Sequence, residues 1–80
     1  MSAVERMIAF HLERLKDKNP AVRLKSIDEL VLLDAVSALE ALENIYRHDP
    51  DESVRLAAQK AGRAIYLKSK GRDDKGGSGS

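Results

Sequence analysis

Apolar side chains recur every three or four positions along most of the chain, the spacing that gathers side chains on one face of an α-helix. The first stripe comprises six positions: Val4, Met7, Ile8, His11, Leu12 and Leu15. Further periodic segments cover residues 20–33, 35–48 and 51–68, and the two prolines lie between segments. Proline is tolerated in the first turn of a helix but not in its interior. The pattern therefore predicts four helices and an all-α fold with one apolar face of each helix in the core.

Polar residues mark the ends of these predicted helices. Asn19 precedes Pro20 as an N-cap, and Asp34 is expected to cap the third helix. Residues 69–80 contain no apolar side chain that a core could bury. Such a composition predicts a disordered tail or an added Gly-Ser linker after a single domain of residues 1–68.

A repeat of 32 residues relates the two halves of this domain. Residues 17–24 (DKNPAVRL) and 49–56 (DPDESVRL) share an Asp six positions before an Arg, with Val directly ahead of that Arg. A small residue four positions after each valine also recurs, as Ser26 and Ala58. A repeat of this length is typical of stacked helical hairpins.

The Asp and Val-Arg arrangement resembles the HEAT repeat, and residues 49–62 are most similar to the short repeats of phycobilisome lyases. The resemblance implies a short α-solenoid of two helical hairpins, about residues 1–33 and 34–68. Its first and third helices would form an outer layer, and its second and fourth helices an inner layer.

Arg23 lies inside the apolar arc of the second helix, where burying an unpaired charge is costly. The resemblance implies a ladder in which such arginines bond to aspartates of a neighbouring repeat. Here the ladder would join Arg23 to Asp49, or Arg55 to Asp17. An anion-binding pair of arginines is the alternative interpretation.

Two surfaces are candidate sites for a protein partner. Helical phase places small and charged side chains on the inner face: Lys25, Asp28, Glu29 and Leu32 from the second helix, and Ala57, Lys60, Ala64 and Lys68 from the fourth. The end face of the second hairpin carries Leu56, Arg63 and Leu67, the candidates for self-association as a homodimer. Two hairpins fall below the three or so repeats that usually make a stable array, which favours association.

Charge is segregated along the chain although the net charge is only +1. Residues 26–52 carry eight acids and one arginine, whereas residues 54–72 carry six basic residues and no acid. The basic helix is the best footprint for nucleic acid. Nucleic acid is nevertheless not the expected partner, because the acidic segment would repel it and Arg55 is expected to bond internally.

No arrangement of side chains predicts chemistry. The chain lacks cysteine, His11 lies on the first apolar stripe, and the acidic turn around His48 lacks the spacing of an EF-hand. Gly62, on the apolar face of the fourth helix, is expected to permit close approach of another helix. We therefore expect no catalytic residue, no metal and no cofactor.

The absence of cysteine, of a signal-peptide pattern and of any run of about 18 apolar residues favours a cytoplasmic protein that does not enter membranes. The predicted function is a non-catalytic protein-binding or scaffold module. The alternatives are an accessory role in bilin chromophore handling, nucleic-acid binding through the fourth helix, and a purely structural homo-oligomer.

Overall fold

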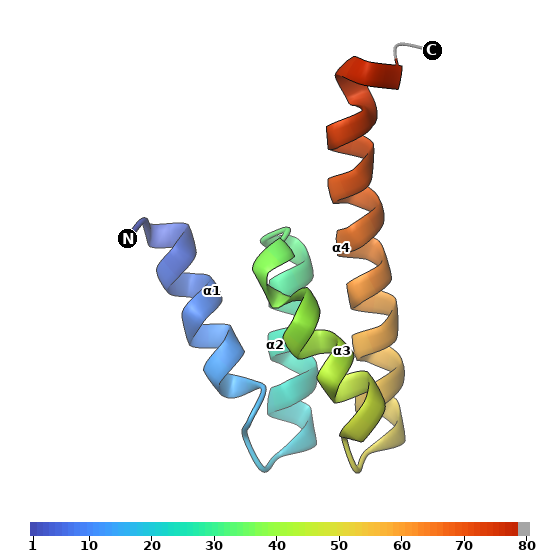
Figure 1. Cartoon of the computed structure of the whole chain (residues 1–80). Helices are drawn as coiled ribbons and strands as arrows, with labels where there is room; N and C mark the ends of the chain where they lie inside the picture. The colour runs from blue at the N-terminus through green and yellow to red at the C-terminus, as the bar shows by residue number, and fades with distance from the viewer. Residues whose placement is uncertain (79–80) are drawn as a thin grey trace.

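Four α-helices form two antiparallel hairpins in the computed structural model, which describes residues 1–78, with side chains through Gly71 (Figure 1). The first hairpin consists of α1 (Ala3–Arg14) and α2 (Pro20–Leu32). The second consists of a 3-10 turn, η1 (Val36–Ala38), followed by α3 (Leu39–His48) and α4 (Glu52–Ser78). The described residues contain no strand, and the predicted all-α, four-helix architecture is confirmed.

Side-chain caps begin three of the helices. Ser2 and Glu5 form a reciprocal capping box on α1, and Asn19 accepts a hydrogen bond from the Ala21 N–H at the start of α2, as predicted. At α4, the Asp51 carboxylate accepts hydrogen bonds from the backbone N–H groups of Ser53 and Val54. Each cap satisfies N–H groups that have no partner within the helix.

Asp34 does not cap the third helix, contrary to the prediction. It has a φ of 51° and lies directly after α2, where the Ala35 N–H donates to the Leu30 carbonyl at 3.1 Å and the Asp34 N–H donates to the Val31 carbonyl at 3.0 Å. These two bonds form a Schellman motif that ends α2. Asp34 occupies the left-handed position of this motif, which is usually taken by glycine. The following helix starts instead with the 3-10 turn, which no side chain caps.

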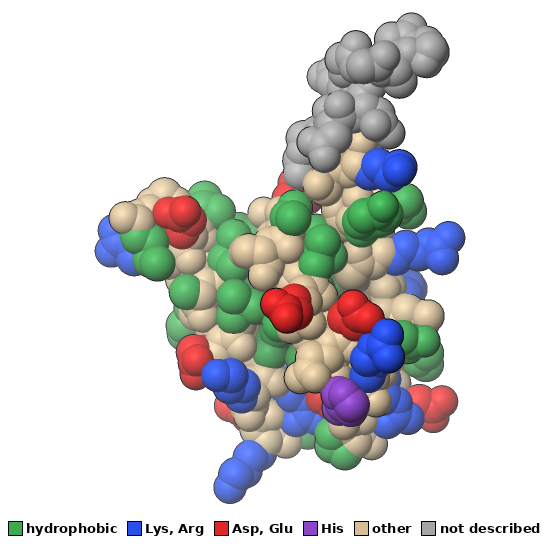
Figure 2. All heavy atoms as spheres, in the orientation of Figure 1, with side chains coloured by type: hydrophobic (Ala, Val, Ile, Leu, Met, Phe, Trp, Pro, Cys, Tyr) green, Lys and Arg blue, Asp and Glu red, His purple; other side chains and the backbone are tan. Residues whose placement is uncertain are grey.

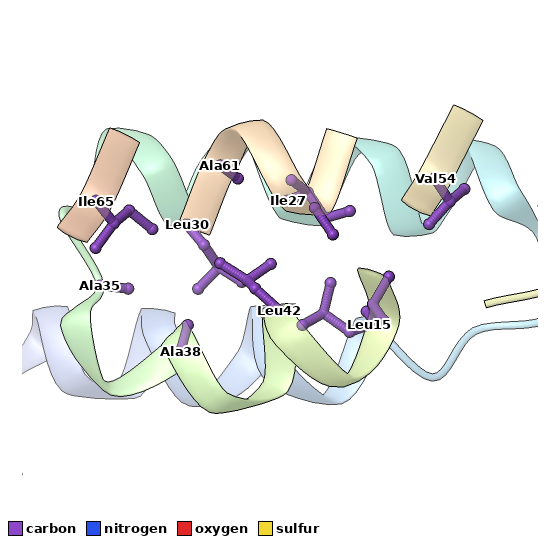
Figure 3. Packing of buried hydrophobic residues seen from close by; sticks show 11 residues of the cluster. Leu15, Ile27, Leu30, Ala35, Ala38, Leu42, Val54, Ala61 and Ile65 are labelled. Atoms are coloured by element: carbon purple, nitrogen blue, oxygen red, sulfur yellow. The ribbon is translucent and has the colours of Figure 1, made fainter. Parts of the chain in front are cut away.

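The core lies between two layers. Figure 3 shows α2 and α4 on one side, α1 and α3 on the other, and the buried side chains between them. The most deeply buried apolar residues are Ile27, Leu30, Ala35, Ala38, Leu42, Val54, Ala58 and Ile65, and Leu15, Ala61 and Ile45 are also buried. The inner and outer layers implied by the HEAT resemblance are therefore present in the structure.

The first helix is less buried than its stripe predicts. Only Leu15 is buried, while Val4 and Met7 are 49% and 46% exposed. Figure 1 shows the reason: α1 diverges from α2 toward its N-terminal end. A helix held by one neighbour at one end leaves the other end of its apolar face uncovered.

The last helix is longer than expected. It extends through Ser78, whereas the composition of residues 69–80 predicted disorder. Residues 69–75 include no proline and several good helix formers, so the helix of the preceding residues can continue without tertiary contacts. Residues 79 and 80 lie outside the described part of the chain. No helix among the described residues combines the length and apolar character required to cross a membrane.

Candidate functional site

A buried ion pair joins the two hairpins. Arg23 donates from Nη2 to Asp49 Oδ1 at 2.8 Å, and its Nε lies 2.8 Å from Asp49 Oδ2. Both side chains are more than nine-tenths buried. The remaining guanidinium nitrogen, Nη1, donates to the carbonyls of Asp17 and Lys18 at 2.7 and 3.1 Å. The structure therefore contains the pairing of Arg23 with Asp49, and this buried, charge-assisted hydrogen bond fixes the orientation of one hairpin on the other.

In the second hairpin, the arginine also bonds to its own turn, but in the residues that the structure describes it lacks the bond to a neighbouring hairpin. Arg55 Nη1 donates to the Asp49 carbonyl, as Arg23 Nη1 donates to the Asp17 carbonyl. Asp17 and Asp49 each accept from the backbone N–H two residues later, at 2.9 Å in both cases. Among the described residues, however, Arg55 bonds to no carboxylate, so the alternative pairing with Asp17 does not occur within one chain.

A groove between α2 and α4 collects most of the predicted inner-face residues; we call it the inner groove. Its lining is Asp28, Val31 and Leu32 from α2, with Ala57, Lys60, Ala61 and Ala64 from α4. Leu32 is 75% exposed at its edge, and alanines from α4 line the other wall. The volume of about 470 Å³ lies within the range of ligand-binding clefts.

Charges of opposite sign line the inner groove, with Asp28 on the α2 wall and Lys60 on the α4 wall. Three other predicted inner-face residues lie outside the lining. Lys25 is exposed, Glu29 is half-buried, and Lys68 forms a 3.2 Å ion pair with Asp34. Fewer residues therefore line the inner groove than the helical phase alone indicated.

A second groove lies between α3 and α4, and the sequence analysis did not predict it. This end groove, of about 370 Å³, is lined by Leu39, Glu43, Tyr46, Ala58, Gln59, Gly62 and Tyr66. Tyr46 is 41% exposed and accepts a 3.4 Å hydrogen bond from Gln59. Tyr66 lines the opposite wall.

Gly62 has no packing role within the chain. A Cβ added at this position would meet no atom within 4 Å, so the expected close approach of another helix is wrong for the helices described here. The 32-residue offset contained a signal for the end groove: Gly62 and Gln59 correspond to Leu30 and Ile27, which the second hairpin buries completely or nearly so.

The residues predicted for self-association lie on the outward side of α4. Leu56 and Leu67 are 51% and 53% exposed, and Arg63 is exposed between them. None of the three lines the inner groove or the end groove. Figure 2 shows such apolar side chains interspersed with basic ones along the visible face of α4.

The titratable groups of the acidic turn serve the fold. Asp49 holds Arg23, and Asp51 accepts hydrogen bonds from the Ser53 hydroxyl and from the backbone at the start of α4. These hydrogen bonds hold the pKa of Asp51 below its ordinary value. Among the described residues, no three His, Asp or Glu side chains converge as metal ligands would. Two of the basic residues of α4, Arg55 and Lys68, are bonded within the chain.

A family model of HEAT repeats matches residues 3–62, and the chain belongs to the HEAT repeat family. Members of this family are generally protein-interaction or scaffold modules without catalytic activity. The finer similarity to phycobilisome-lyase repeats stays a prediction. No curated protein and no solved structure matches the chain.

Proposed function

We propose that the protein is a non-catalytic binding module that holds a helix of a partner protein in the inner groove. The exposure of Leu32 carries this proposal. Leaving one large apolar side chain at the edge of a groove walled by alanines is unfavourable in water, and covering it contributes about 1.5–3 kcal/mol. The alanines permit close approach of a helix backbone.

Specificity would come from the charges on the two walls. A partner helix with a basic residue facing Asp28 and an acidic residue facing Lys60 would satisfy both groups, and the reverse orientation would oppose like charges. The groove therefore favours one direction of the bound helix.

Site-specific photo-crosslinking tests this function. A benzophenone side chain in place of Leu32 should crosslink to one predominant partner in cells of the source organism. The same side chain in place of Ala9, which is exposed on α1, is the matched control and should not.

Affinity for the crosslinked partner then provides the quantitative test. Leu32→Asp combined with Lys60→Glu should weaken binding at least tenfold, which corresponds to about 1.4 kcal/mol. Arg6→Glu, a charge reversal of exposed Arg6 outside the groove, should leave affinity unchanged. Equal affinity of the double variant and the wild type would refute the inner groove as the binding site.

A further inference from the structure

The end groove and the uncovered part of α1 point to a partner that is independent of the inner groove. We propose that copies of this chain stack head to tail, with the first hairpin of one copy seated on the second hairpin of the next. Three observations on different elements support this assembly.

The first observation is the correspondence between the end groove and an interface that already exists in the molecule. Ile27 and Leu30 on α2 are covered by the second hairpin, and the 32-residue offset places Gln59 and Gly62 at the same positions on α4. The missing side chain of Gly62 leaves the end groove open, with Tyr46 and Tyr66 on its walls. A further hairpin would lie over this groove as the second hairpin lies over α2.

The second observation is the unfinished ladder at each end of the molecule. Arg23 donates through Nη1 to its own turn and through Nη2 to the aspartate of the next hairpin, and the second oxygen of that aspartate lies 2.8 Å from Nε. Arg55 makes only the first of these bonds, leaving Nη2 and Nε without a partner among the described residues. At the other end, the Asp17 carboxylate accepts a hydrogen bond from the Asn19 N–H through Oδ1 and, within the described part of the chain, from no arginine.

These two ends complement each other. In a head-to-tail stack, the Asp17 carboxylate of one copy takes the place relative to Arg55 that Asp49 takes relative to Arg23. The new bond would repeat the ion pair that Arg23 and Asp49 already form, and a charge-assisted hydrogen bond of this kind specifies one register.

The third observation is the apolar surface that the first hairpin leaves uncovered. Val4 and Met7 are about half exposed and lie three residues apart on one side of α1, with half-buried His11 four residues further on. An interface that uses different patches on the two partners is heterologous and forms an open chain of copies unless the rotation closes a ring. The second copy supplies both the apolar surface and the carboxylate that the end groove lacks.

Sedimentation of the full chain up to about 1 mM tests the proposal. The average mass should rise steadily with concentration and pass the mass of a dimer. A monomer at every concentration, or a plateau at the dimer, would overturn it.

Complementary blocking variants identify the two faces. Gly62→Arg fills the end groove, and Met7→Glu charges the α1 surface. Each variant alone should associate at least tenfold more weakly than the wild type. A mixture of the two should form dimers that grow no further, because one intact groove and one intact α1 surface remain.

Matched substitutions control for the added charge. Gly71→Arg makes the same change on α4 away from the groove, and Ala9→Glu makes the same change on an exposed part of α1. Both should associate as the wild type does, and circular dichroism should show unchanged helicity for all four variants. Undiminished association of Gly62→Arg alone or of Met7→Glu alone would mean that two identical faces meet, and would refute the head-to-tail arrangement.

Discussion

The two hairpins share a turn but differ in what covers them. Each turn places an aspartate six residues before an arginine and bonds that arginine to the carbonyl of that aspartate. In the first hairpin the arginine also reaches a carboxylate of the neighbouring hairpin, whereas Arg55 in the second bonds to no carboxylate among the described residues. The comparison shows that the local turn is a property of the repeat, while burial is a property of its neighbours.

Equivalent positions of α2 and α4 carry different side chains. Leu30 is fully buried, and its counterpart is Gly62; Ile27 is buried, and its counterpart is Gln59. A terminal repeat requires a more polar outer face for solubility. Glycine in a helix interior is nevertheless a costly way to achieve this, which is the reason for assigning the end groove a binding role.

The largest expected effect is the difference in stability loss between substitutions of Asp49 and Asp17. Asp49→Ala leaves Arg23 buried without its partner and should lower the free energy of unfolding by about 3–5 kcal/mol. Asp17→Ala removes one exposed hydrogen bond and should cost about 1 kcal/mol. Urea unfolding followed by circular dichroism measures both. Equal losses would show that the two turns contribute alike and that the inter-hairpin pair is not special.

Equivalent positions on α2 and α4 should respond with opposite sign. Leu30→Ala creates a cavity and should destabilise the monomer by about 2–5 kcal/mol. Gly62→Ala adds a Cβ into open space and should stabilise it by about 0.5–1 kcal/mol. Thermal unfolding at low concentration checks the pair, and a destabilised Gly62→Ala would show that the groove is filled in solution.

A third pair of equivalent positions, Ser26 and Ala58, differs by one hydroxyl group. Ser26 and Ala58 are both buried, but Ser26 Oγ has no hydrogen-bond partner among the described residues. Ser26→Ala should therefore raise the free energy of unfolding by about 1 kcal/mol, and Ala58→Ser should lower it by a similar amount. Urea titrations of the two variants measure these changes. A lower free energy of unfolding for Ser26→Ala would show that the hydroxyl is hydrogen-bonded.

The smallest effect concerns the caps of the two inner helices. Asn19 caps α2 and does not titrate, whereas Asp51 occupies the same position on α4. Since the folded pKa of Asp51 lies below its ordinary value of 3.8, its stabilisation is present above that value and is lost as the pH falls toward the folded pKa. Asp51→Asn should flatten this acid dependence in stability measured against pH. An unchanged profile would assign the acid sensitivity to other carboxylates.

Much of the fold could be predicted from local patterns. The four helices and the cap at Asn19 follow from periodicity and from the cap residue, and the pairing of Arg23 with Asp49 is one of the two pairings that the HEAT resemblance implied. Four expectations differ from the structure: the cap at Asp34, the burial of the whole α1 stripe, the close approach of a helix at Gly62, and disorder from residue 69. Each of these features depends on how far a neighbouring element extends or on how the chain leaves a helix. The periodicity of apolar residues contains information on neither.

The candidate sites divide in the same way. Helical phase identified Asp28, Leu32, Lys60 and Ala64 as one surface, and the structure places them in one groove. The end groove could not be recognised in advance, because Tyr46, Gly62 and Tyr66 belong to two helices whose separation is set only by packing.

By itself, the sequence determined the helices, their caps, the 32-residue repeat and therefore membership of the HEAT family. These features depend on contacts between residues close along the chain, which spacing records directly. Only the tertiary structure decided which apolar residues remain exposed, which half of the ladder is complete, and that a glycine opens a groove. Those outcomes depend on atoms of distant segments, and the free energy of burial is set by whether such atoms are present.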